Sequence, residues 1–410
     1  MSEVPGNSRL QVTRFKLNTL LDITKAINEH QSQESLVSRY EAILRKELGI
    51  GKIVIYKLAG KWECILSSGV DLEQVEKIDA AKHLVQFEDI TFISVENDQV
   101  LQPFDIIIPV VSNNEHLAMV LIGDIDEESE GVSPVIKHLH FIQTLSNIIV
   151  VAIENIRLNE DNIRQAAIKK ELELASKLQE MLIPDPEKLP SYDAFKVSAF
   201  YHPHMDVGGD YYDIIELGEG EFGFCICDVS GKGISAAIIM SNFQANLRAL
   251  FTSEIPLEIL VEKLNDRVNE STKGERFLTM FIGKYNTLTK ELIYVNAGHN
   301  APLLYNIAAG TLSTLDSNTV GIGMLDEMPP IRPQQMKIDN KLKLFCYTDG
   351  LVEVMLDGNL VEAGTEHIET FLTNNRSLAD NIIEIVKDNG VLQGNASIFD
   401  DITILGFEFT

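Results

Sequence analysis

The chain has 410 residues, which at about 150 residues per domain predicts two or three domains, each long enough for its own hydrophobic core. Hydrophobic residues make up 45% and charged residues 23%, which excludes wholesale disorder. The 61 Asp and Glu outnumber the 34 Lys and Arg, and the net charge of -27 opposes binding to nucleic-acid phosphates. Hard metal cations prefer carboxylate ligands, so a metal site is one use for this acidity.

The four cysteines are too few and too scattered for a disulfide framework or a four-cysteine zinc site. Cys225 and Cys227 alternate in an apolar run, which predicts two buried side chains on one face of a strand. The first residues contain no apolar signal sequence, and no uncharged apolar run reaches the about 18 residues that a membrane span requires. The sequence therefore predicts a soluble, cytoplasmic protein without a membrane span.

Residues 1–14 are predicted to be a flexible N-terminus, and residues 15–133 a mixed α/β domain. Apolar residues recur at helical spacing over residues 17–27 and again over residues 36–48. Strand-like runs follow over residues 52–58, 62–68, 105–111 and 116–122.

Residues 134–183 are predicted to form one linking helix, because no Pro or Gly lies between Val135 and Ile183. Apolar residues spaced by fours, threes and sevens mark a seam along it: Ile149, Ile153, Ile156, Ile163, Ala167, Leu174, Leu178 and Met181. Glu160 and Lys170 interrupt this seam at places where a coiled coil has apolar residues. The seam predicts a homodimer formed through the linking helix, and the alternative is a single amphipathic helix packed on its own domain.

Residues 184–410 open with three prolines that end the helix, and are predicted to form a strand-rich domain. The strand-like runs cover residues 195–201, 223–229, 277–285, 292–296, 341–347 and 401–407, and helical patterns cover residues 235–250 and 256–270.

Aspartates stand at the start or end of four strand-like segments in this domain. They are Asp210 in VGGDYYD, Asp228 in FCICDVSGKG, Asp349 in LKLFCYTDG and Asp400 in FDDITIL. Strand ends that lie side by side bring such carboxylates together, and a pair of divalent cations relieves their repulsion. Mg²⁺ or Mn²⁺ suits these ligands, while the lack of an HExxH motif or a Cys/His cluster disfavours zinc.

Two metal ions held by carboxylates generate hydroxide and clamp a phosphoryl group for in-line attack. Phosphate monoesters hydrolyse so slowly in water that a catalyst must supply on the order of 20 kcal/mol of stabilisation. Ser230 in DVSGKG has no partner His or Lys in a known nucleophile pattern, so it is interpreted as a loop-forming hydroxyl. The pattern therefore favours a metal-dependent phosphatase.

Five motifs follow the order found in metal-dependent PPM-type serine phosphatases: VGGDYYD, CDVSGKGISAA, NAGHNAPLLY, YTDGLVE and DDITIL. Residues 178–410, beginning with LQEMLIP, resemble the SpoIIE-like branch of this family. The resemblance implies an α+β fold, a four-layer α-β-β-α sandwich with two Mn²⁺ or Mg²⁺ ions, and serine/threonine protein phosphatase activity. It also implies a substrate, a phosphorylated STAS-domain anti-anti-sigma protein in a partner-switching pathway that regulates a sigma factor.

Carried over by motif, the resemblance makes the metal ligands Asp210, Asp228, the backbone carbonyl of Val229, Asp349 and Asp400. Asp213 and Asp401 are left out of this set as neighbours. His299 in the AGHN motif is interpreted as a loop-bracing residue, with proton donation as the alternative. Eukaryotic-type members grip the substrate phosphate with an early Arg, where this chain offers His202 and His204, so the phosphate-binding group stays open.

Residues 15 to about 155 resemble a GAF domain in layout, with two helices, a central antiparallel sheet and a long exit helix. GAF domains bind small ligands or dimerise, so the resemblance implies a sensor domain with an unknown ligand or signalling partner. Trp62, Tyr56 and Phe104 are candidates for a ligand pocket, although ordinary core positions are the preferred interpretation. Cys64 is not expected to carry a chromophore.

Two other functions stay open. A diguanylate cyclase is suggested by GGDYYD, which is similar to a GGDEF loop, but that fold has no use for DVSGKG, YTDG or DDITIL. A non-catalytic signalling scaffold would keep the fold, and the loss of one of the four aspartates would have supported it. The three hypotheses differ in what the protein consumes: a phosphorylated protein, GTP or neither.

Overall fold

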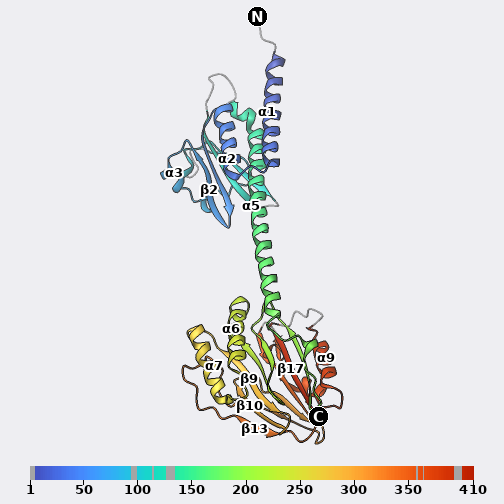
Figure 1. The fold of residues 1–410 in the computed structure, drawn as a ribbon. Helices are drawn as coiled ribbons and strands as arrows, with labels where there is room; N and C mark the ends of the chain where they lie inside the picture. Colours follow the sequence, from blue (N-terminus) through green and yellow to red (C-terminus); the bar gives the residue numbers. More distant parts are fainter. Residues whose placement is uncertain are drawn as a thin grey trace. The chain divides into compact units, whose positions relative to one another are not determined.

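The computed structural model of the protein describes residues 5–93, 99–112, 115–125, 134–356, 359–362, 364–391 and 399–410. The chain forms two compact units, Met1–Ala167 and Ile168–Thr410, and each unit is described by itself (Figure 1). The boundary between the units falls inside one helix, α5 (Pro134–Glu180), which covers most of the predicted linking helix.

The described part of the N-terminal unit is built on one antiparallel sheet with the strand order β2-β1-β5-β4-β3. The strands are β1 (Ile50–Ala59), β2 (Lys61–Ser68), β3 (Thr91–Phe92), β4 (Ile106–Ser112) and β5 (Glu115–Ile125). Besides α5, the helices are α1 (Pro5–Asn28), α2 (Gln33–Ala42), α3 (Leu72–Glu76) and α4 (Ala80–His83). Residues 5–14, predicted to be flexible, are the first turns of α1, because no Pro or Gly interrupts residues 7–28.

The central strands of this sheet are buried on both faces, and the period of two along β1 divides its residues between them. Ile53 and Ile55 join a core that also contains residues of α1, α2 and α5. Val54 and Tyr56 join a second core, which contains residues of α3 and α4.

The residues considered for a ligand pocket belong to this second core. Tyr56 and Phe104 are buried there, and Trp62 packs against this core. The Tyr56 hydroxyl donates a hydrogen bond of 2.8 Å to the Val75 carbonyl. These contacts support the interpretation of ordinary core residues.

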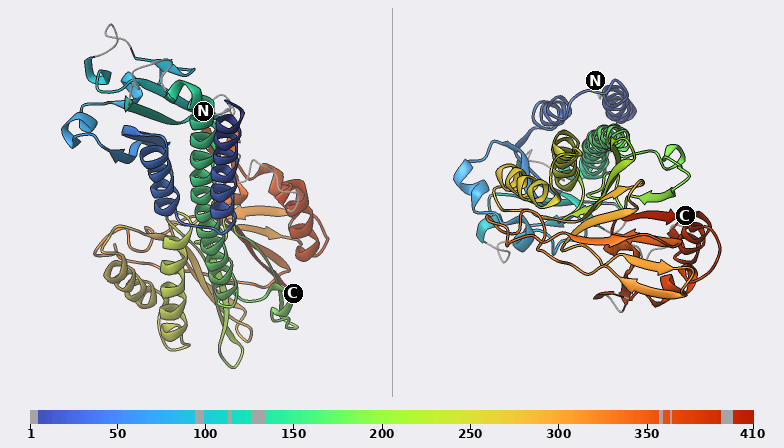
Figure 2. Two further views of the ribbon diagram at one scale, coloured as in Figure 1. Left: turned by 90° about the horizontal axis from the view of Figure 1, so that it is seen from above. Right: turned by 60° about the horizontal axis from the view of Figure 1, so that its bottom comes forward.

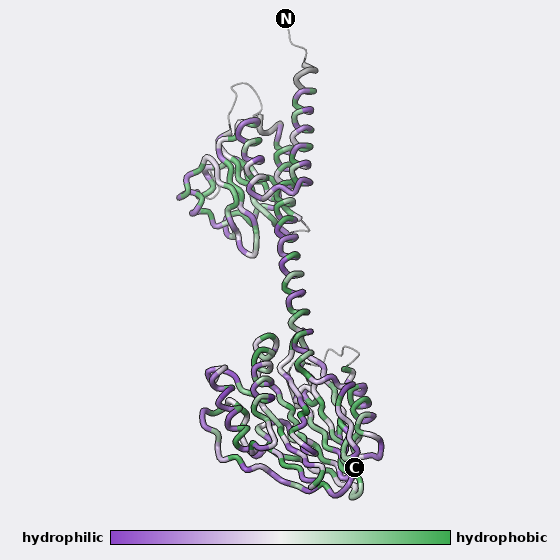
Figure 3. The backbone as a smooth tube through the Cα atoms, in the orientation of Figure 1, coloured by the Kyte–Doolittle hydropathy of each residue, from purple (hydrophilic) through white to green (hydrophobic). Residues whose placement is uncertain are grey.

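The first half of α5 completes the core of the N-terminal unit. The segment His138–Glu180 is long and apolar enough to cross a membrane by composition alone, but Leu145, Ile149 and Ile153 are fully buried in this core. Ile156 packs against the same core. The predicted seam is therefore corrected: up to Ile156 it faces its own domain, and hydrophilic and hydrophobic residues alternate along the rest of the helix (Figure 3). Within the predicted seam, the exposed large apolar residues follow later, at Ile163, Leu174, Leu178 and Met181.

Within the described residues, the C-terminal unit contains two five-stranded antiparallel sheets, with the orders β13-β10-β9-β8-β7 and β12-β11-β14-β17-β6. The first consists of β7 (Tyr211–Gly218), β8 (Glu221–Val229), β9 (Leu278–Asn286), β10 (Glu291–Ala297) and β13 (Gln334–Lys337). The second consists of β6 (Phe195–His202), β11 (Leu303–Asn306), β12 (Thr311–Thr314), β14 (Leu342–Tyr347) and β17 (Ile402–Phe409). A small hairpin adds β15 (Glu353–Leu356) and β16 (Asn359–Glu362).

The two sheets pack face to face, and helices cover their outer faces. Phe224 of β8 and Phe407 of β17 meet between the sheets, with ring centroids 4.5 Å apart. The helices α6 (Ile234–Leu250) and α7 (Leu257–Thr272) pack against the first sheet. The helices α8 (Glu366–Leu372) and α9 (Leu378–Asp388) pack against the second. Figure 2 shows α6 and α7 on one side of the sheets and α9 on the other, so the unit is an α-β-β-α sandwich.

Candidate metal centre

The four predicted aspartates come together at one end of the sandwich. Asp228 lies near the end of β8, and Asp210 directly precedes β7. Because these neighbouring strands are antiparallel, both residues lie at the same end of the sheet. Asp349 follows β14 and Asp400 precedes β17, which are likewise antiparallel neighbours in the second sheet. The order of strands in each sheet thus places two aspartates at the same end.

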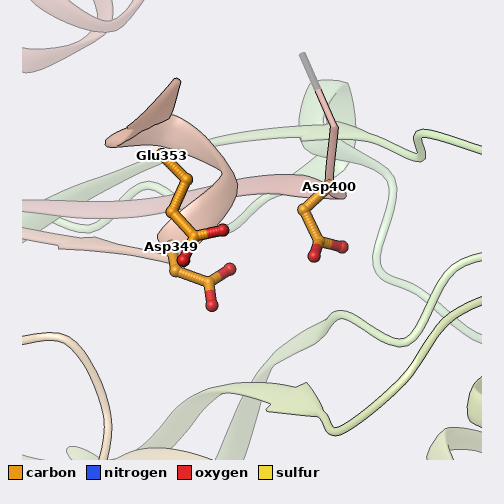
Figure 4. Close-up of side chains that lie close together, drawn as sticks. All are labelled: Asp349, Glu353 and Asp400. Carbon is orange, nitrogen blue, oxygen red and sulfur yellow. The ribbon is translucent and has the colours of Figure 1, made fainter. Parts of the chain in front are cut away.

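Asp228, Asp349 and Asp400 line one cavity of about 190 Å³. The rest of its wall consists of Val229, Ser230, Gly231, Phe277 and Thr279. Figure 4 shows Asp349, Asp400 and a further residue, Glu353, gathered at this place, and one oxygen of each lies within 4.8 Å of the others. Glu353 was not singled out from the sequence, although YTDGLVE places it only four residues after Asp349.

Asp210 is buried and is oriented by two hydroxyl groups. Thr348 and Thr403 donate hydrogen bonds of 2.7 and 2.6 Å to its Oδ2. Thr348 follows β14 and Thr403 lies in β17, so these bonds fix Asp210, which precedes a strand of the first sheet, to the second sheet. Both bonds end on one carboxylate oxygen, which defines the rotation of the group.

Three carboxyl groups of this site, those of Asp210, Asp228 and Asp349, have raised pKa values. Burial, together with the nearby Asp228 carboxylate, raises the pKa of Asp210 well above its usual range. Burial also raises the pKa of Asp228, and Asp349 and Asp400 add to that shift. Burial, followed by Glu353 and Asp400, raises the pKa of Asp349 to about 6. Repulsion among desolvated carboxylates is what a bound cation relieves, and an all-oxygen set of this kind fits Mg²⁺ or Mn²⁺.

Residues 218–410 match the family model of Stage II sporulation protein E (SpoIIE). The C-terminal region carries a SpoIIE-family domain. The chain is 25% identical to the phosphoserine phosphatase RsbU of Bacillus subtilis, over 59% of this chain and 70% of RsbU. It is 26% identical to the protein IcfG of Synechocystis sp., over 59% of this chain and 42% of IcfG, so it spans less than half the length of that relative.

A solved structure supports the same assignment at the level of the fold. The SiaA-PP2C domain of Pseudomonas aeruginosa matches 60% of this chain and 99% of its own length, with a TM-score of 0.50 and 19% sequence identity. The SpoIIE-family domain therefore has a PP2C-like fold. This fold favours the phosphatase hypothesis over the diguanylate cyclase.

Lys232 of the SpoIIE-family domain was not singled out from the sequence, although it lies in the DVSGKG motif. Its Nζ lies 2.6 Å from Oδ2 of Asp400 and also donates a hydrogen bond to the Phe399 carbonyl. Its charge lowers the pKa of Asp349, against the larger opposing effect of burial. Lys232 therefore balances part of the negative charge around the cavity.

Asp213 and Asp401, which were left out of the ligand set, have other partners in this domain. Arg248 donates to both oxygens of Asp213, with distances of 2.8 and 2.9 Å. Asp401 accepts backbone hydrogen bonds of 2.8 Å from His204 and 2.6 Å from Gly209. The first interaction joins α6 to β7, and the second holds the loop that leads to Asp210.

His299 braces the AGHN turn beside the cavity. Its Nδ1 lies 2.9 Å from the Thr279 hydroxyl, and its backbone N–H donates to Oδ1 of Asn296 at 2.9 Å. Burial lowers the pKa of His299 to about 3, so its ring is neutral near pH 7. A neutral, buried imidazole favours the loop-bracing interpretation over proton donation.

The remaining candidates are Ser230 and the two histidines His202 and His204. Ser230 accepts a hydrogen bond of 3.0 Å from the backbone of Phe277, which agrees with a loop-forming hydroxyl. His202 and His204, considered for phosphate binding, line a different groove of about 760 Å³, which Ile234 also lines.

Proposed function

We propose that this protein is a metal-dependent phosphoserine/phosphothreonine protein phosphatase. The observation that carries the proposal is the meeting of four aspartates from two sheets at one end of a PP2C-like sandwich, with raised pKa values where they are most buried. The residues proposed to hold two Mn²⁺ or Mg²⁺ ions are Asp210, Asp228, the carbonyl of Val229, Asp349 and Asp400. Such ions supply a water-derived nucleophile near neutral pH and stabilise the charge of phosphoryl transfer.

The protein's own side chains contribute position and charge. Thr348 and Thr403 hold Asp210 in one orientation, and preorganised groups lose little energy to reorganisation during a reaction. Lys232 places an ammonium group beside Asp400, where an entering phosphoryl group would meet a positive charge. This charge makes Lys232 a stronger candidate for phosphate binding than His202 or His204, which line a separate groove.

The substrate class rests on the relatives and on the motif order. RsbU is named a phosphoserine phosphatase, which supports phosphoserine as the substrate group. The SpoIIE-like motifs support a phosphorylated STAS-domain anti-anti-sigma protein, in a cytoplasmic partner-switching pathway. The net charge of -27 argues against a nucleic-acid substrate.

We further propose that the N-terminal unit is a GAF-like sensor. It binds a small ligand or a signalling partner and regulates the phosphatase activity. The helix α5 begins in this unit, and its last residues, from Ile168 on, belong to the C-terminal unit. Ile163 and Leu174 are exposed on it at positions of the seam, which supports a homodimer through the later part of the helix. A ligand could bias two packings of such a helix pair only through its different affinities for them.

Replacing both Ile163 and Leu174 with Asp tests the dimer. Sedimentation of the double variant should show monomers. Its phosphatase activity should no longer respond to a ligand or partner bound at the N-terminal unit. Ile156 is unsuitable for this test because it packs against the core of its own domain. A wild-type protein that sediments as a monomer would contradict the dimer.

The phosphatase is tested by incubating the full chain with a phosphoserine peptide and with a phosphorylated STAS-domain protein. Phosphate release that requires Mn²⁺ or Mg²⁺ and stops with EDTA is the expected result. Consumption of GTP without phosphopeptide hydrolysis would favour the cyclase. Failure to hydrolyse any phosphomonoester with Mn²⁺ would favour the scaffold.

A further inference from the structure

The loop after β8 is tied to the segment before β9 by three hydrogen bonds of one residue, Ser230. Its backbone N–H donates to the Phe277 carbonyl at 2.8 Å, and its Oγ accepts the Phe277 N–H at 3.0 Å. Its carbonyl accepts a hydrogen bond of 2.9 Å from Nη1 of Arg276. Ser230 and Phe277 both line the cavity of the candidate metal centre, so these contacts hold Arg276 beside the cavity wall.

The guanidinium of Arg276 occupies the space over Gly231, the next residue of that wall. A Cβ atom added at Gly231 would lie 1.9 Å from Nη1 and 2.8 Å from Cζ of Arg276. Gly231 also has a φ of 96°, which residues with a side chain rarely adopt. The glycine after Ser230 in the DVSGKG motif therefore lets the guanidinium approach the cavity closely.

Lys232 and Arg276 both bring positive charge to this wall, but they differ in what they already bind. Nζ of Lys232 lies 2.6 Å from Oδ2 of Asp400, so its charge is already paired. In the part of the chain that the structure describes, Arg276 is half-buried and no carboxylate pairs with it, since its side chain donates to the neutral carbonyl of Ser230. A guanidinium carries five N–H groups, so Arg276 keeps donors and a full charge for a ligand.

We propose that Arg276 binds the phosphoryl group of the substrate at the rim of the metal centre. This inference rests on the proposed function, because it takes the cavity as the place where a phosphate monoester binds. A planar guanidinium matches two oxygens of a phosphate with two parallel hydrogen bonds, which the point charge of a lysine does not. Arg276 is thus a stronger candidate for phosphate binding than Lys232, whose ammonium group balances Asp400.

The experiment compares Arg276→Met with wild type in the full chain. The KM for a phosphoserine peptide, measured with Mn²⁺, should rise about 10- to 100-fold, which corresponds to the loss of hydrogen bonds to a charged group. The kcat should change less than KM, because a group that holds substrate and transition state alike affects mainly KM.

Two calorimetric titrations separate phosphate binding from damage to the loop. Inorganic phosphate, added to the Mg²⁺-loaded protein, should bind about 10- to 100-fold more weakly in Arg276→Met than in wild type. Mn²⁺, added to the metal-free protein, should bind with the affinity of wild type, because Arg276 is not a metal ligand. A collapsed loop would weaken Mn²⁺ binding as well, since Asp228 lies next to it.

The matched control is Arg332→Met, the same substitution at an exposed arginine outside the residues that line the cavity. Its KM and phosphate affinity should equal those of wild type, although it loses the same charge from a protein with a net charge of -27. Arg276→Lys keeps the charge without the guanidinium fork, so its KM should lie between those of wild type and Arg276→Met.

A wild-type KM and phosphate affinity in Arg276→Met would overturn the inference, as would weakened Mn²⁺ binding in that variant or equal losses in Arg332→Met. A lower kcat with unchanged KM would also overturn it. If Arg276→Met does not fold, Arg276→Lys carries the test, and a wild-type KM there overturns the inference. A wild-type protein that hydrolyses no phosphomonoester with Mn²⁺ would instead reject the proposed function, and this inference with it.

Discussion

Two clusters of buried charge, one in each unit, are balanced in opposite ways. In the N-terminal unit, Lys57 is buried with its Nζ 2.8 Å from Glu154, which also pairs with Arg157. The hydrogen bond from Arg157, with further help from Lys57, lowers the pKa of Glu154 to about 2. In the SpoIIE-family domain, burial and neighbouring carboxylates raise the pKa of Asp349 to about 6.

The difference separates structural charge from functional charge. A carboxylate with a lowered pKa already has its cations within the protein, so it needs nothing more to stay ionised. Carboxyl groups with raised pKa values, gathered around one cavity, lack enough positive charge and mark a candidate functional site. Asp213, buried and paired with Arg248, is a carboxylate of the C-terminal unit whose cation the protein itself supplies.

The largest effect should follow from Asp228→Asn, which removes a charged ligand from the cavity. Mn²⁺-dependent hydrolysis of a simple phosphomonoester should fall by about a hundredfold or more, since even partners outside the ligand set matter on this scale. The metal-free fold should survive, because the substitution relieves repulsion. Asp326→Asn, at an exposed position, is the matched control and should retain activity. Full activity in Asp228→Asn would refute the assignment of the site.

Removing one partner of the buried Lys57–Glu154 ion pair should lower stability and leave Mn²⁺ binding unchanged, the reverse of what is expected at the cavity. Lys57→Met leaves the partly buried Glu154 without one of its two cations, and should lower the free energy of unfolding of the N-terminal unit by about 1 to 3 kcal/mol. Thermal unfolding measures this loss, and Mn²⁺ affinity should not change. A variant that is fully stable but binds Mn²⁺ poorly would break the comparison.

The stability of the metal-free protein should also depend on pH, and this effect should be smaller. Because folding raises the pKa of Asp349 from its ordinary value of 3.8 to about 6, the metal-free fold binds an extra proton in this range and loses stability as the pH rises through it. Asp349→Asn should match wild type near pH 4 and be more stable by about 1 to 2 kcal/mol at pH 7 without metal. Chemical unfolding of both proteins at the two pH values measures the difference, and an Asp349→Asn variant less stable than wild type at pH 7 would contradict the raised pKa.

Regular patterns in the sequence predicted the sandwich strands, because apolar runs identify strands. They also predicted the gathering of the aspartates, because residues at the ends of neighbouring strands lie close together. The same reasoning could not assign the helical seam. The apolar stripe that contains Ile149 and Ile153 has the same spacing whether it packs against its own sheet or against a second chain. In the structure it packs against its own sheet. Lys232 and Glu353 were missed because their roles depend on which strand ends become neighbours in the fold.

If the proposed function is right, the carboxylates of Asp210, Asp228, Asp349 and Asp400 lack only divalent cations. Calorimetric titration of the metal-free full chain with Mn²⁺ tests this most directly. We predict saturable binding of two ions near pH 7.5, weaker binding at pH 5.5 where protons compete at Asp349, and loss of at least one ion in Asp228→Asn. Absence of saturable binding, or identical titrations of wild type and Asp228→Asn, would contradict the account.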